Sequence, residues 1–316
     1  MDSLKLAISV VTPLMVYLIV GILVQKFQIM SRENLKALNV LIFRVLIALA
    51  LFFDVYRSDL KQSFQVRMFL YVFLFLAALI AFLWITVSRT VKDRAAATVM
   101  IQGMFRSNYV LYGGLLAASI SGDAGAALAA SLCVMVVPMF NIMAVILFET
   151  RRGGSVKASE IVISIFKNPL VDAALAGMIL NFLNIPLPEL LTSPLQKLGS
   201  IATPLALVVL GGSLSFGSLV KHKKYLTVTV LARLFLIPAI ALTGAILLGM
   251  RNEQLAVILA IFGSPTAVAS VPMTYAMGGD GELAGEIVVT TTLFSVLSVF
   301  ILVFLLSFFG FIPANI

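Results

Sequence analysis

Long apolar runs separated by short polar segments form the dominant pattern of the chain. The runs lack the ten-residue alternation of barrel strands, and each is about 20 residues long, enough to cross a bilayer as a helix. The pattern therefore predicts ten membrane-spanning helices, over residues 6–24, 38–56, 68–87, 95–118, 124–148, 161–183, 198–217, 225–249, 254–277 and 283–309. The first run has no small-residue cleavage site and nine runs follow it, so we interpret it as a span rather than a signal peptide.

Composition supports an integral membrane protein and excludes several other classes. The chain is 61% hydrophobic and 11% charged, whereas a soluble domain carries about 25% charged residues. It therefore has too few polar residues to cover a water-facing surface, which excludes a soluble enzyme, a nucleic-acid binder and a disordered protein. We predict an all-α integral membrane protein in contact with membrane lipid, with no nucleic-acid partner.

Basic residues in the short loops predict the orientation of the chain. The net charge is +8, and Arg32, Arg94, Arg151 and Lys223 each lie in a loop that follows an odd-numbered span. Because basic loops are retained in the cytoplasm, we predict a multi-pass protein of the cytoplasmic (inner) membrane with both termini external. The loop after the second span departs from this pattern, with Arg57, Lys61 and Arg67.

An internal repeat divides the chain into two halves. A shift of 157 positions places Phe105, Ser107, Asn108, Gly122 and Asp123 on Phe262, Ser264, Pro265, Gly279 and Asp280. Each half contains five predicted spans, an odd number, so the halves enter the membrane from opposite faces. We therefore predict two inverted five-helix repeats, residues 1–150 and 151–316, an arrangement that transporters use for alternating access around a central site.

The fourth and ninth predicted spans contain helix-breaking sequences at matching depth. The fourth reads Arg106-Ser107-Asn108-Tyr109 before Gly113, and the ninth reads Gly263-Ser264-Pro265-Thr266. Both begin about eleven residues into their spans, or about 16 Å along a helix, near the middle of a hydrocarbon core of about 30 Å. Freed backbone groups at this depth must be buried in protein or line a wet cavity. The pattern therefore predicts a site between two broken helices.

Arg106 indicates a negatively charged ligand for this site. A cation in the middle of a bilayer is costly unless it is paired or hydrated, and no acid lies at matching depth in spans four or nine. Asn108 offers a hydrogen-bond donor and an acceptor together, which suits recognition of a carboxylate. The alternative interpretation is an internal ion pair or a snorkelling Arg106.

Four other charged residues have structural interpretations. Asp123 and Asp280 follow glycine at the starts of spans five and ten, so each is predicted to be an N-cap, with a gating role as the alternative. Arg233 and Asp172 lie in the predicted cytoplasmic halves of their spans, where a structural pair is the favoured interpretation.

Several short motifs are distributed over the two halves of the chain. They include Arg106-Ser107-Asn108, Asn168-Pro169-Leu170, Ile185-Pro186-Leu187-Pro188, Pro204-Leu205-Ala206-Leu207, Gly211-Gly212-Ser213-Leu214 and Gly278-Gly279-Asp280. With them, nearly the whole chain resembles the auxin efflux carrier family. Bacterial members of that family are permeases for malate, malonate and similar organic anions, and plant members export auxin, which is also a carboxylate.

The resemblance implies a particular architecture. Helices four and nine are expected to cross at their broken centres. Helices one, two, six and seven are expected to form a scaffold, as part of a homodimer, and helices three to five and eight to ten a moving transport domain. The chain has Leu115 where the family has a proline after the glycine of span four, and another proline is replaced near Ala48. We therefore expect the first crossover to be less broken than the second.

Together these observations predict a secondary transporter that moves a small organic anion, a mono- or dicarboxylate, by an elevator type of alternating access. The predicted substrate-binding residues are Arg106, Ser107, Asn108, Gly113, Asn141, Ser264, Pro265 and Thr266. Gating or structural roles are predicted for Asp123, Asp280 and Pro204.

Three alternatives remain at this stage. A sodium-coupled organic-anion symporter of the bile-acid type would need acidic and amide side chains around the crossover, and the spans supply few: Asn108, Asn141 and Glu286. A channel would share the same pattern. A membrane enzyme is disfavoured because the single Cys133 and the single His222, placed in a basic loop, offer neither a metal cluster nor a histidine-based triad, so no cofactor or metal is expected. No GxxxxGK[ST] motif is present, so we expect proton coupling, sodium coupling or uniport rather than ATP hydrolysis.

Overall fold

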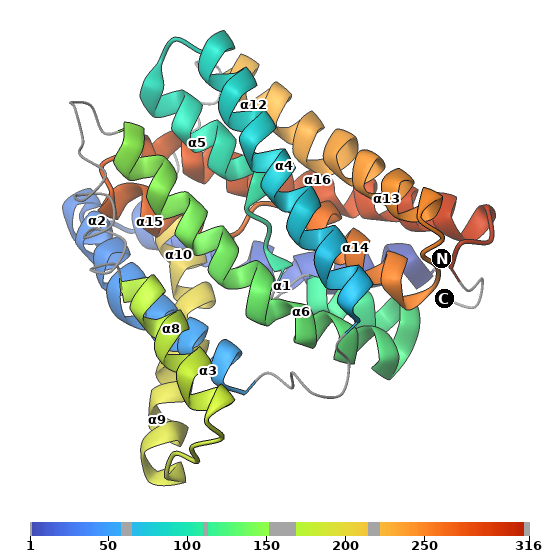
Figure 1. Ribbon diagram of the computed structural model, residues 1–316. Coiled ribbons are helices and arrows are strands. Elements are labelled where there is room, and N and C mark those ends of the chain that lie inside the picture. Colours follow the sequence, from blue (N-terminus) through green and yellow to red (C-terminus); the bar gives the residue numbers. More distant parts are fainter. Residues whose placement is uncertain (1, 58–64, 110–112, 152–168, 214–221, 313–316) are drawn as a thin grey trace.

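The computed structural model describes residues 2–57, 65–109, 113–151, 169–213 and 222–312 (Figure 1). Over these residues the chain is helical, with one isolated antiparallel β-bridge. The first half contains α1 (Asp2–Lys26), α2 (Arg32–Leu41), the π-helix η1 (Ile42–Ile47), α3 (Ala48–Tyr56), α4 (Val66–Thr90), α5 (Arg94–Phe105) and α6 (Gly114–Arg151). The all-α prediction is confirmed for this part of the chain.

The second half is also helical. It contains α8 (Pro169–Phe182), α9 (Glu189–Ser200), α10 (Ala202–Ser213), α12 (Lys223–Leu231), the π-helix η3 (Ala232–Leu236), α13 (Ile237–Leu247), α14 (Glu253–Gly263), α15 (Ser270–Ala276) and α16 (Gly281–Phe308). Each of the ten predicted runs carries helix, although residues 161–168 and 214–217 of the sixth and seventh runs lie outside the described residues.

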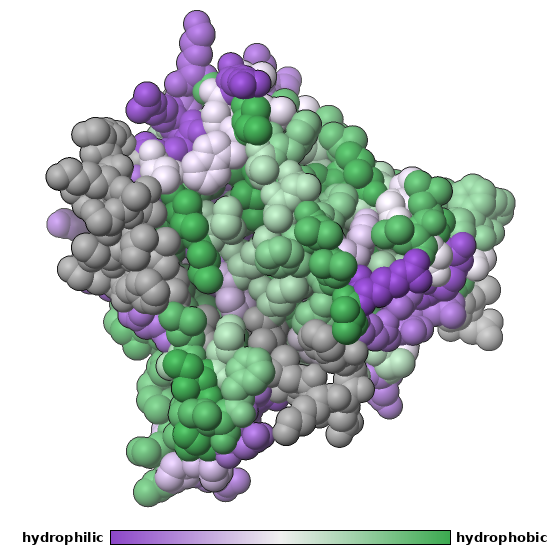
Figure 2. Space-filling model, viewed as in Figure 1, coloured by the Kyte–Doolittle hydropathy of each residue, from purple (hydrophilic) through white to green (hydrophobic). Residues whose placement is uncertain are grey.

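Six stretches among the described residues are long and apolar enough to cross a membrane. They are Glu33–Phe53, Val66–Thr90, Leu116–Arg151, Glu189–Gly212, Lys223–Leu247 and Gly281–Phe308. Hydrophobic residues also cover much of the visible surface, including the part where α8 and α9 project (Figure 2). The protein is therefore a multi-pass membrane protein, and the count of ten spans in two inverted repeats stays a prediction.

Side-chain caps and a glycine fix several helix ends. Asp93 accepts hydrogen bonds from the backbone N–H groups of Ala95 and Ala96, at 2.9 and 3.2 Å, and so begins α5. Asp280 accepts from the N–H of Leu283 at 3.0 Å, which confirms its predicted role as the N-cap of α16. Within α6, Gly122 has a φ of 59°, a left-handed conformation that favours glycine, and kinks the helix beside the exposed Asp123.

Close helix contacts join the two halves of the chain. α1 packs against α10, α3 packs against α8 and α9, and α6 packs against α14. A Cβ atom on Gly21 would lie 2.0 Å from the carbonyl oxygen of Val208, and one on Gly211 would lie 2.1 Å from that of Leu18. The backbones of α1 and α10 are therefore in direct contact, as small residues permit in membrane helices. In Figure 1, α3, α8 and α9 lie together, away from α4, α13 and α14.

Candidate functional site

The two predicted breaks are present, and they pair with each other. α5 ends at Phe105 and α14 ends at Gly263, and an extended segment follows each helix. The N–H of Asn108 donates to the carbonyl of Pro265 at 2.8 Å, and the N–H of Ala267 donates to the carbonyl of Arg106 at 3.0 Å. These bonds form the antiparallel bridge between Ser107 and Thr266. Each break therefore satisfies backbone groups that the other would leave unpaired in the membrane.

The described non-helical residues are Arg106–Asn108 in the first segment and Ser264–Ala269 in the second, with residues 110–112 outside the description. The expectation that the first crossover is less broken than the second therefore stays a prediction. Hydrogen bonding to the second segment holds the first one extended, so the break does not require proline.

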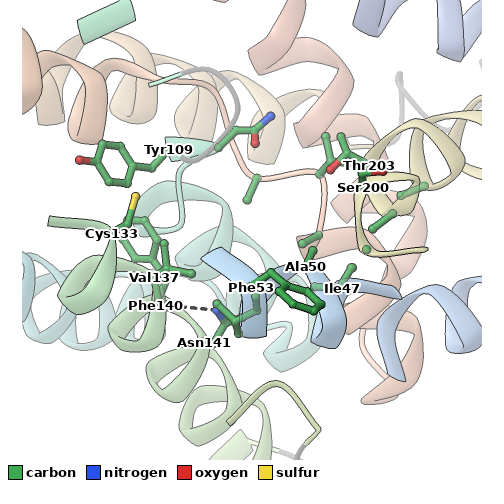
Figure 3. A pocket seen from close by; sticks show the side chains of 18 of the residues that line it. Ile47, Ala50, Phe53, Tyr109, Cys133, Val137, Phe140, Asn141, Ser200 and Thr203 are labelled. Carbon is green, nitrogen blue, oxygen red and sulfur yellow. Dashed lines mark hydrogen bonds between the residues drawn. The ribbon is translucent and has the colours of Figure 1, made fainter. Parts of the chain in front are cut away.

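A cavity of about 580 Å³ lies beside the crossing. It runs from the buried segment Arg106–Tyr109 to the C-terminal end of α9 and to Arg57 after α3, where exposed residues connect it to the surface. In Figure 3, Tyr109, Cys133, Val137 and Phe140 stand on one side and Ile47, Ala50, Ser200 and Thr203 on the other. The remaining lining residues are Leu51, Phe53, Ala130, Asn141, Gln196, Gly199, Ala202, Ala206, Ala267, Val268 and Ala269.

Arg106 lies at the buried end of this cavity, with only 3% of its surface exposed. Its guanidinium donates to the sulfur of Met273 at 2.8 Å and to Oδ1 of Asn141 at 2.6 Å. A thioether sulfur is a weak acceptor, and no carboxylate among the described residues lies within ion-pair distance of Arg106. The positive charge is therefore held in place by neutral groups and stays available to an anion in the cavity.

Ser107 and Asn108 line the cavity next to this charge. The Oγ of Ser107 and the Nδ2 of Asn108 are buried, and neither has a hydrogen-bond partner in the part of the chain described. Asn108 is only 6% exposed, and buried polar groups are almost always hydrogen-bonded. A hydroxyl and an amide donor beside a cation form a set that a carboxylate oxygen would satisfy.

Arg233 is the residue that sequence reasoning placed wrongly. It is fully buried in the π-helix η3, and it reaches the crossing rather than an acid. It donates to carbonyl oxygens at the C-terminal ends of both broken helices: Met104 at 2.9 Å, Phe105 at 3.5 Å, Ile261 at 3.0 Å and Ser264 at 2.9 Å. The predicted pair with Asp172 is wrong, because Asp172 is exposed. The sequence feature that could have indicated this role is the position of Arg233, about nine residues into its predicted span.

This arrangement changes the electrostatics of the crossing. The C-terminal end of a helix carries partial negative charge, and two such ends meet here. Arg233 offsets both of them through its four carbonyl contacts. The crossing therefore presents the charge of Arg106 to the cavity without two opposing negative helix ends.

Other residues of the predicted site lie off the cavity. Pro265 uses its carbonyl in the bridge, Ser264 donates its hydroxyl to the carbonyl of Ala260, and Thr266 donates its own to the carbonyl of Gly103 at 2.7 Å. Gly113 does not line the cavity either. A Cβ atom there would lie 2.8 Å from the carbonyl oxygen of Ala260, so this glycine allows α14 to approach closely.

The predicted gating residues are also placed away from the site. Pro204 is in the first turn of α10, Asp123 is exposed beside the kink of α6, and Asp280 caps α16. None of the three lines the cavity. Their predicted gating role therefore stays untested, while a local structural role is visible for Asp280.

An apolar cluster fills the space beyond the crossing, and we call it the apolar seal. Its buried residues include Leu35 on α2, Leu210 on α10, and Leu283 and Ile287 on α16. Three of its members, Ala202, Ala206 and Val268, also line the cavity. The seal therefore adjoins the cavity at these three residues.

Comparison with known proteins gives the family. The family model described as membrane transport protein matches residues 6–303 of the chain. No curated protein matches the chain. The match covers both breaks, Arg233 and all of the cavity lining. With its apolar helices, crossing segments and buried cation, the chain belongs to the auxin efflux carrier family of membrane transport proteins.

Proposed function

We propose that this protein is a secondary transporter that moves a small organic anion across the cytoplasmic membrane by alternating access. The observation that carries the proposal is Arg106, a buried cation without a carboxylate partner among the described residues, at the closed end of a cavity. Membership of a transporter family supports the same function.

In this proposal the carboxylate of the substrate binds at the first crossover segment. Arg106 supplies the charge, and Ser107 Oγ and Asn108 Nδ2 supply hydrogen-bond donors that have no partner among the described residues. Asn141 orients Arg106 through its Oδ1 and is itself held by a hydrogen bond from its Nδ2 to the carbonyl of Val137 at 2.8 Å. The substrate body lies against apolar lining such as Phe53 and Phe140. Backbone at Pro265 completes the wall through the bridge.

The cavity location supports an elevator mechanism. Its walls come from α3, α9 and α10 on one side and from α6 and the crossing on the other. The first group belongs to the expected scaffold, which is made of predicted spans one, two, six and seven. The second group belongs to the expected transport domain, which is made of predicted spans three to five and eight to ten. Opening the apolar seal by sliding one group against the other would expose the same site to the opposite side of the membrane. Two copies associated through their scaffolds would give the homodimer that the family resemblance implies.

The contacts of Glu286 argue against the sodium-symport alternative at this crossing. Glu286 contacts His222 rather than the crossing, and Asn141 already accepts a hydrogen bond from Arg106. A site that presents a cation and unpartnered donors favours an anion over Na⁺, which binds oxygen ligands. In this proposal the packed residues of the apolar seal close the far side of the cavity, which favours a gated carrier over an open channel.

A transport assay tests the function directly. Purified protein is reconstituted into proteoliposomes, and uptake of radiolabelled mono- and dicarboxylates is measured with and without pH and sodium gradients. We expect at least one organic anion to be taken up saturably, and uptake to be lost in Arg106→Gln. A protein that moves none of the anions, or that moves organic cations equally well, would contradict the proposal.

The single cysteine offers a second test on the native chain. Cys133 lines the cavity on α6, so a bound substrate would cover it. We expect an impermeant thiol reagent to inhibit uptake, transported anions to slow the labelling, and Cys133→Ser to be insensitive to the reagent. Labelling from outside intact cells would place the cavity mouth, and with it the predicted external termini, on the external side. Labelling only in inverted vesicles would invert the orientation.

A further inference from the structure

A groove lined by apolar side chains lies between α4 and the C-terminal part of α6. It has a volume of about 320 Å³, and its lining includes Ala77, Ala81 and Trp84 on α4 and Met139 and Met143 on α6. Figure 1 shows the two helices side by side, with α4 in cyan and this part of α6 in green. Ala81 is exposed and Trp84 is half-buried. The groove is therefore open to the surroundings of the molecule, which in a membrane are lipid.

Two arginines meet at one end of this groove. The guanidinium of Arg151, the last residue of α6, donates to Oγ of Ser88. Ser88 lies four residues after Trp84, and residues four apart lie on the same face of a helix. Arg94, the first residue of α5, is close enough for its charge to act on that of Arg151. Two cations that repel each other therefore lie one helical turn beyond the apolar lining.

No carboxylate neutralises these two charges in the part of the chain that the structure describes. Asp93, beside Arg94, accepts hydrogen bonds as the N-cap of α5. Glu149 precedes Arg151 by two residues, and residues two apart on a helix do not face each other. Ser88 is the one acceptor that the guanidinium of Arg151 reaches among the described residues, and its Nε is buried without a partner there. A guanidinium has five N–H donors, so this end of the groove lacks acceptors and negative charge.

The length of the groove fits one acyl chain of a phospholipid. Ala77 lies eleven residues before Ser88 in α4, or about 16 Å at 1.5 Å per residue. Half of a hydrocarbon core of about 30 Å is nearly the same length. Trp84 lies one turn from Ser88, and tryptophan is enriched at the level of the headgroups. In Figure 2 the surface along α4 is largely hydrophobic and becomes hydrophilic at the end where α4 meets α5.

We propose that this groove binds an anionic phospholipid, with its phosphate at Arg94 and Arg151 and one acyl chain along Trp84, Ala81 and Ala77. Guanidinium groups bind phosphate through both charge and hydrogen bonds, and the apolar lining accommodates the chain. A zwitterionic lipid also carries a phosphate, but its ammonium group would add a third positive charge beside the two arginines. The site therefore selects a headgroup with net negative charge. It shares no lining residue with the cavity at the crossing, and it does not depend on the proposed transport function.

The fluorescence of the native tryptophan tests this site. Trp84 is the single tryptophan of the chain, and it is quenched when bromine atoms on an acyl chain come into contact with it. The purified protein is placed in nanodiscs of phosphatidylcholine that contain an increasing fraction of brominated phosphatidylglycerol or of brominated phosphatidylcholine. We expect half-maximal quenching at a mole fraction about 25-fold lower for the anionic lipid, about fivefold for each arginine. This comparison needs no variant, and equal quenching by the two lipids would overturn the proposal.

Variants then assign the preference to particular side chains. Arg151→Gln and Arg94→Gln should each reduce the preference for the anionic lipid about fivefold. Lys224→Gln, which removes an exposed cation from the first turn of α12, should keep the preference of the wild type. Ala81→Phe fills the groove and leaves both arginines in place, so it should reduce quenching by either lipid. An equal loss of preference in Lys224→Gln and Arg151→Gln would show a general attraction to the positive face and would overturn the proposal, as would unchanged quenching in Ala81→Phe.

Discussion

The two segments that cross at the centre of the protein pair through backbone hydrogen bonds but differ in their side-chain environments. In the first segment, Ser107 Oγ and Asn108 Nδ2 are buried without partners among the described residues, and both residues line the cavity. In the second, the hydroxyl of Ser264 donates to a carbonyl of α14, the helix that it follows, and the hydroxyl of Thr266 donates to a carbonyl of α5. Both segments therefore contribute backbone to the crossing, while the proposed binding side chains lie in the first.

One exchange at repeat-related positions explains much of this difference. Asn108 corresponds to Pro265, and proline has no N–H and no polar side chain. Pro265 contributes only its carbonyl, which accepts from the N–H of Asn108 at 2.8 Å. The second segment thus supports the backbone of the first and leaves the amide side chain of Asn108 facing the cavity. We expect variants in the two segments to fail in different measurements.

Loss of the Arg233 contacts that hold both segments should have the largest effect, and this effect should be on stability. Arg233→Gln removes most of the donors that reach four carbonyl oxygens. We expect the free energy of unfolding to fall by about 3–5 kcal/mol, as when one partner of a buried charged contact is removed. Thermal denaturation in detergent measures this. Arg251→Gln is the control, because Arg251 also donates to carbonyls but is exposed. Equal losses of unfolding free energy in the two variants would contradict the proposed role of Arg233 in holding both segments.

Removal of the charge in the first segment should act on transport instead. For Arg106→Gln we expect anion transport to fall by at least about 30-fold, because losing one side of a buried charged contact costs about 2–5 kcal/mol. Stability should be unchanged or higher, since the variant no longer buries a cation without a carboxylate partner. Uptake rates and melting temperatures should be compared in the same preparations. Normal transport would show that Arg106 does not bind the substrate.

The amide of the first segment should have a smaller effect of the same kind. Asn108→Ala removes one hydrogen-bond donor to a charged ligand, which costs about 1.5–3 kcal/mol, or roughly ten- to a hundred-fold in affinity. Competition uptake gives the affinity. Asn108→Asp keeps the shape but adds a negative charge, so it should weaken anion binding further. Asn34→Ala, at an exposed amide on α2, serves as the control, and unchanged affinity in Asn108→Ala would exclude the amide from the site.

The smallest effect is expected for a variant of the second segment, and it should be on stability. Thr266→Val preserves shape but removes the hydroxyl that donates to the carbonyl of Gly103 at 2.7 Å. We expect a loss of about 1 kcal/mol in stability, the usual contribution of one hydrogen bond, with substrate affinity within about twofold of the wild type. A large loss of affinity without a loss of stability would place Thr266 in the binding site and remove the contrast between the segments.

The sequence predicted the breaks and, through the family resemblance, their crossing, but not the hydrogen bonds that pair them. Arg106-Ser107-Asn108 and Ser264-Pro265 are recognisable because a cation, polar side chains and proline interrupt apolar helix. The contact of Arg233 with both broken ends was missed, since it joins residues up to 129 positions apart. The same limit applies to His222 and Glu286, which are 64 positions apart. The position of a residue along its predicted span also did not distinguish the hydroxyl of the cavity-lining Ser107 from those of Ser264 and Thr266, which donate to backbone carbonyls.

The antiparallel bridge has a consequence for synthesis of the protein. The backbone groups of the first segment are completed by residues such as Pro265 and Ala267, which the ribosome adds about 160 residues later. Until then, the half-inserted chain must keep Arg106 and its neighbours in contact with water, with lipid headgroups or with the insertion machinery. Neither half can reach its final form by itself, so we expect a chain truncated after the first repeat to be recognised and degraded by membrane quality control.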